Sequence, residues 1–150
     1  MQSHYNKTKL KRKIAKALQV LLEKDRELLA IGVNERSVSQ KLATYLEREF
    51  PEWTVDSEYN RKGTLVKRLP GLGSKTNIVV PDILIHERQE DKNLLVIEIK
   101  TNKKGLASDI KKLKLFTSPE GDYNYKLGLS ILFDKLNPPL LKWFVNGLED

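Results

Sequence analysis

The chain has 150 residues, with 27 Lys and Arg against 20 Asp and Glu, so its formal net charge is +7. A chain of this length forms one domain around a single core. The absence of Cys excludes disulfides and thiolate chemistry, and with only two His we expect neither a His-based zinc site nor a Ser-His triad. No apolar run reaches the ~18 residues of a membrane span, and the first residues lack the apolar run of a signal peptide. We therefore expect a cytoplasmic protein without a membrane partner.

The positive charge is concentrated in three blocks of the sequence. Residues 1–24, 61–75 and 100–114 carry net charges of +6, +5 and +5, whereas the rest of the chain sums to −9. Such blocks suit a phosphate backbone, because Lys and Arg gain affinity there by releasing condensed counterions. The alternative interpretation is that solvated lysine surfaces keep the protein soluble. The charge pattern thus favours a polyanion such as a nucleic acid as partner.

The first predicted element is an amphipathic helix, whose apolar residues recur at helical spacing opposite a basic face. These apolar residues are Leu10, Ile14, Leu18 and Leu21. We interpret residues 1–33 as a basic helical extension and residues 34–150 as the main domain. A second helix is predicted from Glu35 to Phe50, because apolar residues again follow the helical period and Pro51 ends it.

The later part of the chain alternates between strand and helix patterns. The segment at 54–61 is rich in β-branched and aromatic residues and predicts a strand, and the glycine-containing basic segment at 62–77 predicts a loop. Two apolar runs at 77–86 and 93–100 predict a β-hairpin. Further along, we expect a helix at 103–116, a strand at 123–133 and a short closing helix within 137–148. The order after the extension is α, β, β, β, α, β, α.

Three charged residues of the hairpin are expected on one face of the sheet. Side chains alternate along a strand, so Glu98 and Lys100 point to the same side. If the hairpin loop pairs His86 with Leu94, Asp82 lies opposite Glu98, with Cβ atoms about 4.5–5.5 Å apart. Two carboxylates held that close resist ionisation unless a cation compensates them.

A divalent cation resolves this conflict, and Mg²⁺ is the expected one, with Mn²⁺ as a substitute, because it prefers hard oxygen ligands. Mg²⁺ there would polarise a phosphate and lower the pKa of an attacking water. Lys100 would help to position that water, and the backbone carbonyl of Ile99 is a further candidate ligand. The alternative is a solvated polar face on which Lys100 merely neutralises the two acids. Pro81 favours the functional interpretation, because proline inside a strand-like run marks an edge or a distortion.

Pro-Asp at 81–82, fifteen intervening residues and Glu-Ile-Lys at 98–100 resemble the signature of the PD-(D/E)XK nucleases, the restriction-endonuclease-like superfamily. The resemblance covers about two thirds of the chain, residues 34–133. It implies an α/β fold with an αβββαβ core, in which a mixed sheet is flanked by helices. It also implies a Mg²⁺-dependent nuclease in which Asp82 and Glu98 bind metal and Lys100 acts in catalysis.

The resemblance extends to residues outside the hairpin. Many members of the family place a Glu of the first core helix in the metal shell, and Glu35 fits that position. Glu58 is a weaker substitute for the same role. The alternative for Glu35 is that it is only a first-turn acid stabilised by the helix dipole. The helix after the Glu-x-Lys motif often contacts nucleic acid, which points to its lysines. The candidate nucleic-acid contacts of the loop and the helix are Arg61, Lys62, Lys67, Arg68, Lys75, Lys103, Lys104, Lys111 and Lys112.

The sequence therefore predicts a metal-dependent endonuclease that hydrolyses DNA phosphodiester bonds. One active site per chain favours a symmetric homodimer for cutting both strands. Two alternatives remain open, and both are nucleic-acid-binding proteins without catalysis. One is a helix-turn-helix protein with residues 37–46 in the recognition helix, and the other is an inactive member of the nuclease family.

Overall fold

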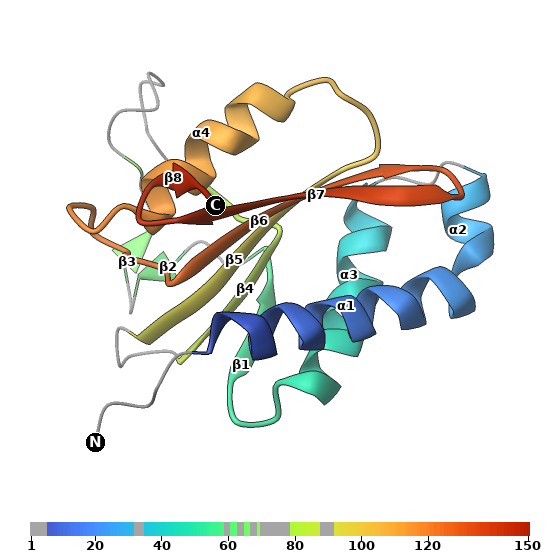
Figure 1. The fold of residues 1–150 in the computed structure, drawn as a ribbon, viewed down its shortest axis with the longest axis horizontal. Coiled ribbons are helices and arrows are strands. Elements are labelled where there is room, and N and C mark those ends of the chain that lie inside the picture. Colours follow the sequence, from blue (N-terminus) through green and yellow to red (C-terminus); the bar gives the residue numbers. More distant parts are fainter. Residues whose placement is uncertain are drawn as a thin grey trace.

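The computed structural model describes residues 6–31, 35–58, 61–62, 65–66, 69, 79–87 and 92–150. Within these residues, a six-stranded mixed sheet is flanked by helices (Figure 1). The helices are α1 (Lys7–Lys24), α2 (Arg26–Ala30), α3 (Glu35–Glu49) and α4 (Leu106–Thr117). The strands are β1 (Thr54–Ser57), β2 (Arg61–Lys62), β3 (Leu65–Val66), β4 (Ile83–Glu87), β5 (Lys92–Lys100), β6 (Leu127–Asp134), β7 (Asn137–Val145) and β8 (Leu148–Glu149).

The main sheet has the strand order β1-β4-β5-β6-β7-β8, and β2 and β3 form a second, two-stranded sheet. Neighbouring strands run antiparallel, except that β5 and β6 are parallel and are joined through α4. The predicted α/β class, the mixed sheet with flanking helices and the β4–β5 hairpin are confirmed. No helix among the described residues is long and apolar enough to cross a membrane.

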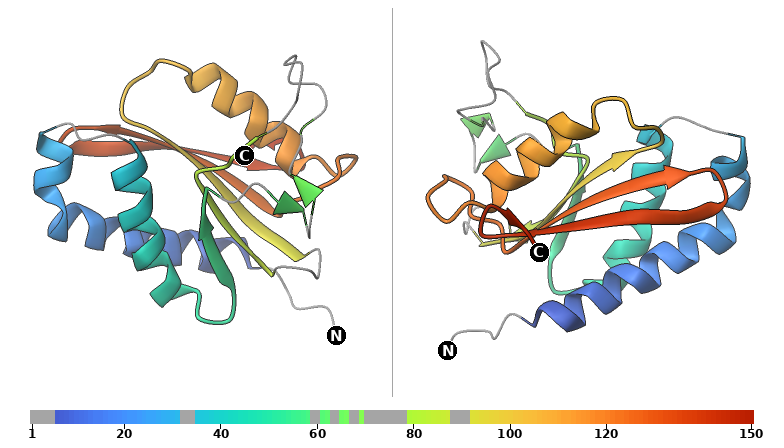
Figure 2. Two further views of the ribbon diagram at one scale, coloured as in Figure 1. Left: turned by 180° about the vertical axis from the view of Figure 1, so that it is seen from behind. Right: turned by 45° about the horizontal axis from the view of Figure 1, so that its top comes forward.

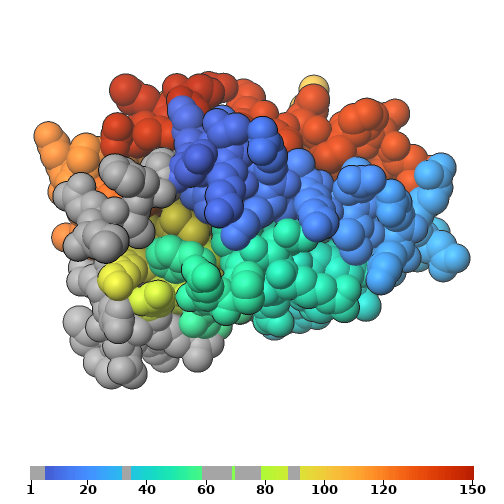
Figure 3. Space-filling model, turned by 60° about the horizontal axis from the view of Figure 1, so that its bottom comes forward, coloured from blue at the N-terminus to red at the C-terminus, as the bar shows by residue number. Residues whose placement is uncertain are grey.

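Helices α1 and α3 cover one face of the sheet, and α4 covers the other (Figure 2). Leu95, Ile97 and Ile99 of β5 join the core under α1 and α3. The basic helix α1 contributes Ile14, Leu18 and Leu21 to this core, and it lies along α3 on the surface (Figure 3). The helix predicted as an extension therefore packs as part of the main core.

The opposite face carries a smaller core beneath α4. Leu84 and Val96 pack there against Leu113 and Phe116 of α4. Helix α4 approaches β6 closely at Gly128, where an added Cβ would lie 3.1 Å from the Thr117 side chain. Glycine at this position thus allows α4 to lie directly over β5 and β6.

The predicted closing helix within 137–148 is wrong, because this segment forms strands β7 and β8. Its leucines fit a helical period, but residues of β7 pair with β6, as Leu141 does with Ile131, and this pairing decides the structure. Pro138 and Pro139 stand near the start of β7, where the missing N–H groups are tolerated. The strand predicted at 54–61 ends at Ser57, and β6 begins at Leu127 rather than 123.

The pairing between β4 and β5 is as predicted near the motif and different near the loop. Ile83 pairs with Ile97, which matches the expected register. A register shift between Ile85 and His86 then brings His86 opposite Asn93 rather than the predicted Leu94. The irregularity lies at the loop end of the hairpin, so it leaves the surroundings of Asp82 and Glu98 unchanged.

Candidate active site

Asp82 and Glu98 come together where β4 begins. Asp82 occupies the bend between the buried Pro81 and the first residue of β4, which pairs with the residue before Glu98. Its Oδ2 accepts a hydrogen bond of 2.7 Å from the backbone N–H of Ile99. This bond holds the carboxyl group against β5, because it comes from the residue next to Glu98. The predicted proximity of the two acids therefore follows from the hairpin register and this bond.

Glu98 is buried in the face of the sheet that α4 covers, with 4% of its surface exposed. Its neighbour on β6 is Ser130, which is also buried. Among the described residues, Glu98 Oε1 has no hydrogen-bond partner. A buried carboxylate oxygen without a partner is unfavourable for folding, so this group calls for either a proton or a cation.

Burial raises the pKa of Glu98 well above its ordinary value, and the negative charges of Asp82 and Asp109 raise it further, against a lowering by Lys112. Burial also raises the pKa of Asp82, although the Ile99 N–H and a hydrogen bond with Glu98 act in the opposite direction. The pair therefore resists full ionisation, which is the electrostatic conflict predicted from the sequence.

Lys100 lies at the end of β5 between two further carboxylates. Its Nζ is 3.8 Å from Glu35 Oε2 and 3.5 Å from Asp109 Oδ2. Burial lowers the pKa of Lys100, but the charges of Asp109, Glu35 and Asp82 outweigh this effect, so the pKa is raised overall. The Lys100 side chain is therefore an ammonium ion on the same face as Glu98.

Glu35 is the first residue of α3 and reaches the end of β5 from the other face of the sheet. Its Oε1 accepts a hydrogen bond of 3.3 Å from the backbone N–H of Thr101, and its Oε2 faces Lys100. The structure thus brings Glu35 to Lys100 and the end of β5. Glu58, the weaker substitute, forms an ion pair of 2.9 Å with Arg36, and its N–H donates to the backbone carbonyl of Asp82.

Asp109 belongs to the site, although the sequence analysis assigned it no role. It lies in the first turn of α4 with 2% of its surface exposed, and its Oδ1 is 3.7 Å from Lys112 Nζ. Burial raises the pKa of Asp109, against the lowering effect of Lys100 and Lys112. The sequence signal was its position as the sole acid among residues 100–114. That signal does not reveal burial, which results from the packing of α4 on the sheet.

The turn before α4 closes directly over Lys100. Gly105 precedes the helix with a φ of +78°, a conformation that favours glycine. A Cβ at this position would lie 3.5 Å from Lys100 Cε and 3.6 Å from its Nζ. The backbone of the turn therefore packs against the lysine side chain.

Only some of the residues predicted to contact nucleic acid have side chains that the structure describes. Lys103, Lys104 and Lys111 are exposed, whereas Lys112 is half-buried and faces Asp109. The side chains of Arg61 and Lys62, together with Lys67, Arg68 and Lys75, lie outside the described residues. In the first basic block, several lysines already form ion pairs. Lys7 and Lys11 lie 2.9 and 3.2 Å from Asp150, and Lys16 lies 3.6 Å from Glu49.

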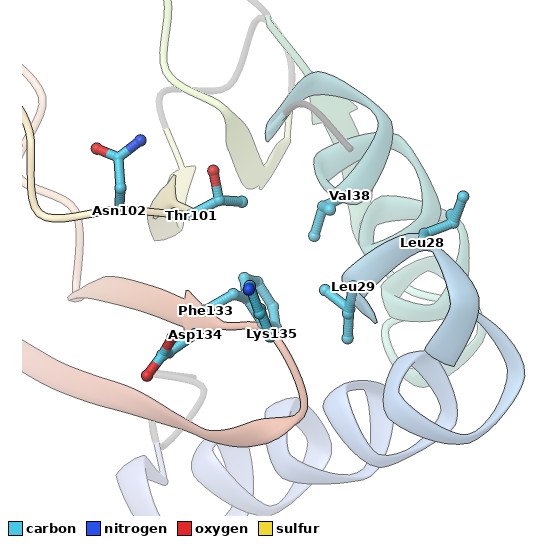
Figure 4. A pocket seen from close by; sticks show the side chains of 8 residues that line it. All are labelled: Leu28, Leu29, Val38, Thr101, Asn102, Phe133, Asp134 and Lys135. Atoms are coloured by element: carbon cyan, nitrogen blue, oxygen red, sulfur yellow. The ribbon is translucent and has the colours of Figure 1, made fainter. Parts of the chain in front are cut away.

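A pocket of about 240 Å³ lies at the carboxyl ends of β5 and β6, on the side of the sheet that α1 and α3 cover (Figure 4). Its walls include apolar side chains of α2 and α3, such as Leu29 and Val38, and the buried Phe133 of β6. Its rim includes Thr101, whose backbone N–H binds Glu35. Among the described residues, its lining thus combines apolar side chains with polar and charged ones, and it does not include Asp82, Glu98 or Asp109.

The residues present fit a hard cation such as Mg²⁺. In the part of the chain that the structure describes, no three or more His, Cys, Asp or Glu side chains gather closely enough to hold a metal ion. The available donors are therefore two carboxylates, Asp82 and Glu98, with the backbone carbonyl of Ile99 between Glu98 and Lys100 in the chain. Mg²⁺ commonly uses one or two carboxylates and completes its shell with water and substrate phosphate. The unpartnered oxygen of Glu98 supports this fit.

No family model matches the sequence, and no significantly similar protein is found among curated proteins.

Proposed function

We propose that this protein is a Mg²⁺-dependent nuclease of the PD-(D/E)XK type that hydrolyses phosphodiester bonds of DNA. The observation that carries the proposal is the buried carboxylate of Glu98, held beside Asp82 with one oxygen unpartnered among the described residues. A nuclease site explains why such an unfavourable pair is kept on one face of the sheet, next to an ammonium group.

The order of elements also supports the proposal. Helix α3 is followed in the main sheet by β1, β4 and β5, then by α4 and β6. This is the αβββαβ order expected of a restriction-endonuclease-like core. Asp82 stands immediately before the second of these strands, and Glu98 and Lys100 stand at the end of the third.

Asp82 and Glu98 would hold the metal, with the Ile99 carbonyl as a further ligand, and Mn²⁺ would substitute because it shares the preference for oxygen. When bound, the metal supplies a Lewis acid for the scissile phosphate and lowers the pKa of a water molecule. The Asp82 carboxylate is held in place by the Ile99 N–H throughout. The hydrophobic β5 strand keeps Glu98 rigid, since its neighbours Ile97 and Ile99 are fully buried.

Lys100 would donate hydrogen bonds to a non-bridging phosphate oxygen and offset the negative charge that develops in the transition state. Its raised pKa keeps it protonated for this role at neutral pH. Glu35 orients the ammonium group from the side of α3, at 3.8 Å. We assign Glu35 to this role rather than to the metal shell, because no three acidic or His side chains among the described residues gather closely enough to hold a metal ion.

The exposed lysines after β5 would hold the DNA backbone near the site. Lys103 and Lys104 precede α4, and Lys111 lies on it, so all three are close in sequence to Lys100. Their charges would bind phosphates without reading the base sequence. Cutting of both strands of a duplex would use a symmetric homodimer, since one chain has one such site.

The buried surface of α3 weighs against the helix-turn-helix alternative. Val38, Leu42 and Leu46 of the proposed recognition helix lie in the main core, with at most 1% of their surface exposed. A helix that packs its central stripe against the sheet has less surface left for the major groove. We therefore keep the non-catalytic nuclease fold as the competing possibility.

The test is a cleavage assay with Mg²⁺ on three substrates: plasmid, four-way junction and single-stranded DNA. The wild-type chain, Glu98→Gln and the control Glu120→Gln are compared, because Glu120 is an exposed acid of the loop after α4. We expect cleavage by the wild type and the control, none by Glu98→Gln, and none in EDTA. Cleavage by Glu98→Gln at the wild-type rate would refute the assignment. DNA binding without cleavage by the wild type would instead favour the inactive fold.

A further inference from the structure

Asp109 pairs with two lysine side chains although it is almost fully buried. Its Oδ2 lies 3.5 Å from Lys100 Nζ and its Oδ1 lies 3.7 Å from Lys112 Nζ. One lysine belongs to β5 and the other to α4, so this single carboxylate links the strand that carries the motif to the helix above it. The proposed nuclease mechanism gives this carboxylate no part.

The surroundings of Asp109 fix where the Lys100 ammonium group lies. Lys100 has one carboxylate partner on each side: Glu35 comes from α3, which packs on one face of the sheet, and Asp109 comes from α4, which packs on the other. Glu98 lies on the face covered by α4. An ammonium group attracted by Glu35 alone would move toward α3 and away from Glu98, because lysine has a long and flexible side chain.

The backbone around Asp109 is also arranged for this contact. The left-handed turn at Gly105 lets the start of α4 approach the Lys100 side chain, and the N–H of Asp109 bonds to the carbonyl of Gly105. Asp109 Oδ2 lies 3.5 Å from the Lys100 ammonium group, close enough to interact with its N–H donors, and it has no other donor within the described residues. Because Asp109 is buried, its attraction for the Lys100 ammonium group is screened less by water than that of an ion pair on the surface.

We infer that Asp109 is a positioning residue, which holds the ammonium group of Lys100 on the face of the sheet that carries Asp82 and Glu98. This inference rests on the proposed function, since Lys100 is the group that would act on phosphate. The Asp109 carboxylate contacts Lys100 and Lys112 and acts through the first of them. Rate enhancement by a correctly aimed charge depends on such supporting contacts.

The direct test replaces Asp109 by Asn, which keeps the side-chain volume and removes the charge. In single-turnover cleavage we expect the rate constant to fall by about 10- to 100-fold, with the DNA concentration at half-maximal rate unchanged. Asp25→Asn is the matched control, because Asp25 also accepts a hydrogen bond, from the Tyr45 hydroxyl, but lies at the junction of α1 and α2. An unchanged rate for Asp109→Asn would overturn the inference.

A double-mutant cycle separates positioning from a merely structural role. If Asp109 acts through Lys100, adding Asp109→Asn to Lys100→Ala lowers the cleavage rate no further than Lys100→Ala alone. If the second substitution causes the same fold-loss in both backgrounds, Asp109 does not act through Lys100 and the inference fails. Slow residual cleavage is measured over long incubations with excess protein.

A third measurement does not depend on cleavage. Carbon-13 relaxation at Lys100 Cε reports the mobility of this side chain, and we expect it to be more mobile in Asp109→Asn than in the wild type or Asp25→Asn. Equal mobility would contradict the positioning role. If the wild type does not cleave DNA but the mobility changes as expected, the nuclease proposal fails while the contact between Asp109 and Lys100 stands.

Discussion

Replacing Glu98 by Gln is expected to stabilise the metal-free protein at neutral and alkaline pH. The structure buries this carboxylate beside two other acids, and one of its oxygens is unpartnered among the described residues. Gln has nearly the same shape but no charge to desolvate. Leaving a buried polar group unsatisfied costs about 1–3 kcal/mol, and more when the group is charged. We therefore expect the free energy of unfolding of Glu98→Gln to exceed that of the wild type by about 1–3 kcal/mol at pH 8.

The sign of the pH dependence follows from the direction of the pKa shift. The pKa of Glu98 is raised in the folded state, so the folded protein binds the proton more tightly than the unfolded chain does. The contribution of Glu98 to wild-type stability is thus greatest below the unfolded pKa of about 4.3 and is lost as the pH rises from there through the folded pKa. Each unit by which the pKa is raised corresponds to about 1.4 kcal/mol. Gln lacks this dependence, so the two proteins should converge in stability toward pH 4.

The assay is urea denaturation followed by circular dichroism from pH 4 to pH 8 in EDTA. Thermal melts provide a second measure, because 1 kcal/mol shifts the melting temperature of a chain of this size by about 2–4 °C. A Glu98→Gln protein that is less stable than the wild type at pH 8 would refute the reasoning. That result would mean that ionised Glu98 is well compensated without any metal.

Two further predictions concern catalysis and DNA binding. Lys100→Ala should lower the cleavage rate by about 10²- to 10³-fold, because a charge-stabilising donor is lost, while the Kd for DNA measured by fluorescence anisotropy stays close to the wild-type value. Cleavage at the full rate would remove Lys100 from the mechanism. Replacing Lys103, Lys104 and Lys111 together by Gln should make the decrease of the logarithm of the DNA-binding constant with the logarithm of the salt concentration less steep. The magnitude of the slope should fall by about 2.7, since each phosphate contact contributes about 0.9. An unchanged slope would show that these lysines do not contact phosphate.

The central hairpin could be predicted because a strand has a simple period. Alternation places Glu98 and Lys100 on one face whatever the partner strand is. The observed pairing of Ile83 with Ile97 then places Asp82 beside Glu98, as the sequence suggested. The loop end could not be predicted in the same way, because a bulge inserts a residue without changing the apolar pattern.

The parts that could not be predicted depend on contacts between distant segments. The leucines of 137–148 fit a helix as well as a strand, and only the pairing with β6 selects β7. The apolar stripe of α1 was recognised, but its packing into the main core depends on α3, which the stripe does not specify. The burial of Asp109 likewise depends on α4 lying over β5, a contact to which the lysine-rich pattern of the helix gives no clue.

The central claim is that Asp82 and Glu98 together bind a divalent cation, and titration calorimetry with Mg²⁺ and Mn²⁺ tests it most directly. The wild type, the double variant Asp82→Asn/Glu98→Gln and the control Asp25→Asn are compared at pH 7.5, without DNA. We predict that the wild type and Asp25→Asn bind the cation with the same affinity and that the double variant does not bind it. Equal affinity in all three proteins would contradict the proposed site.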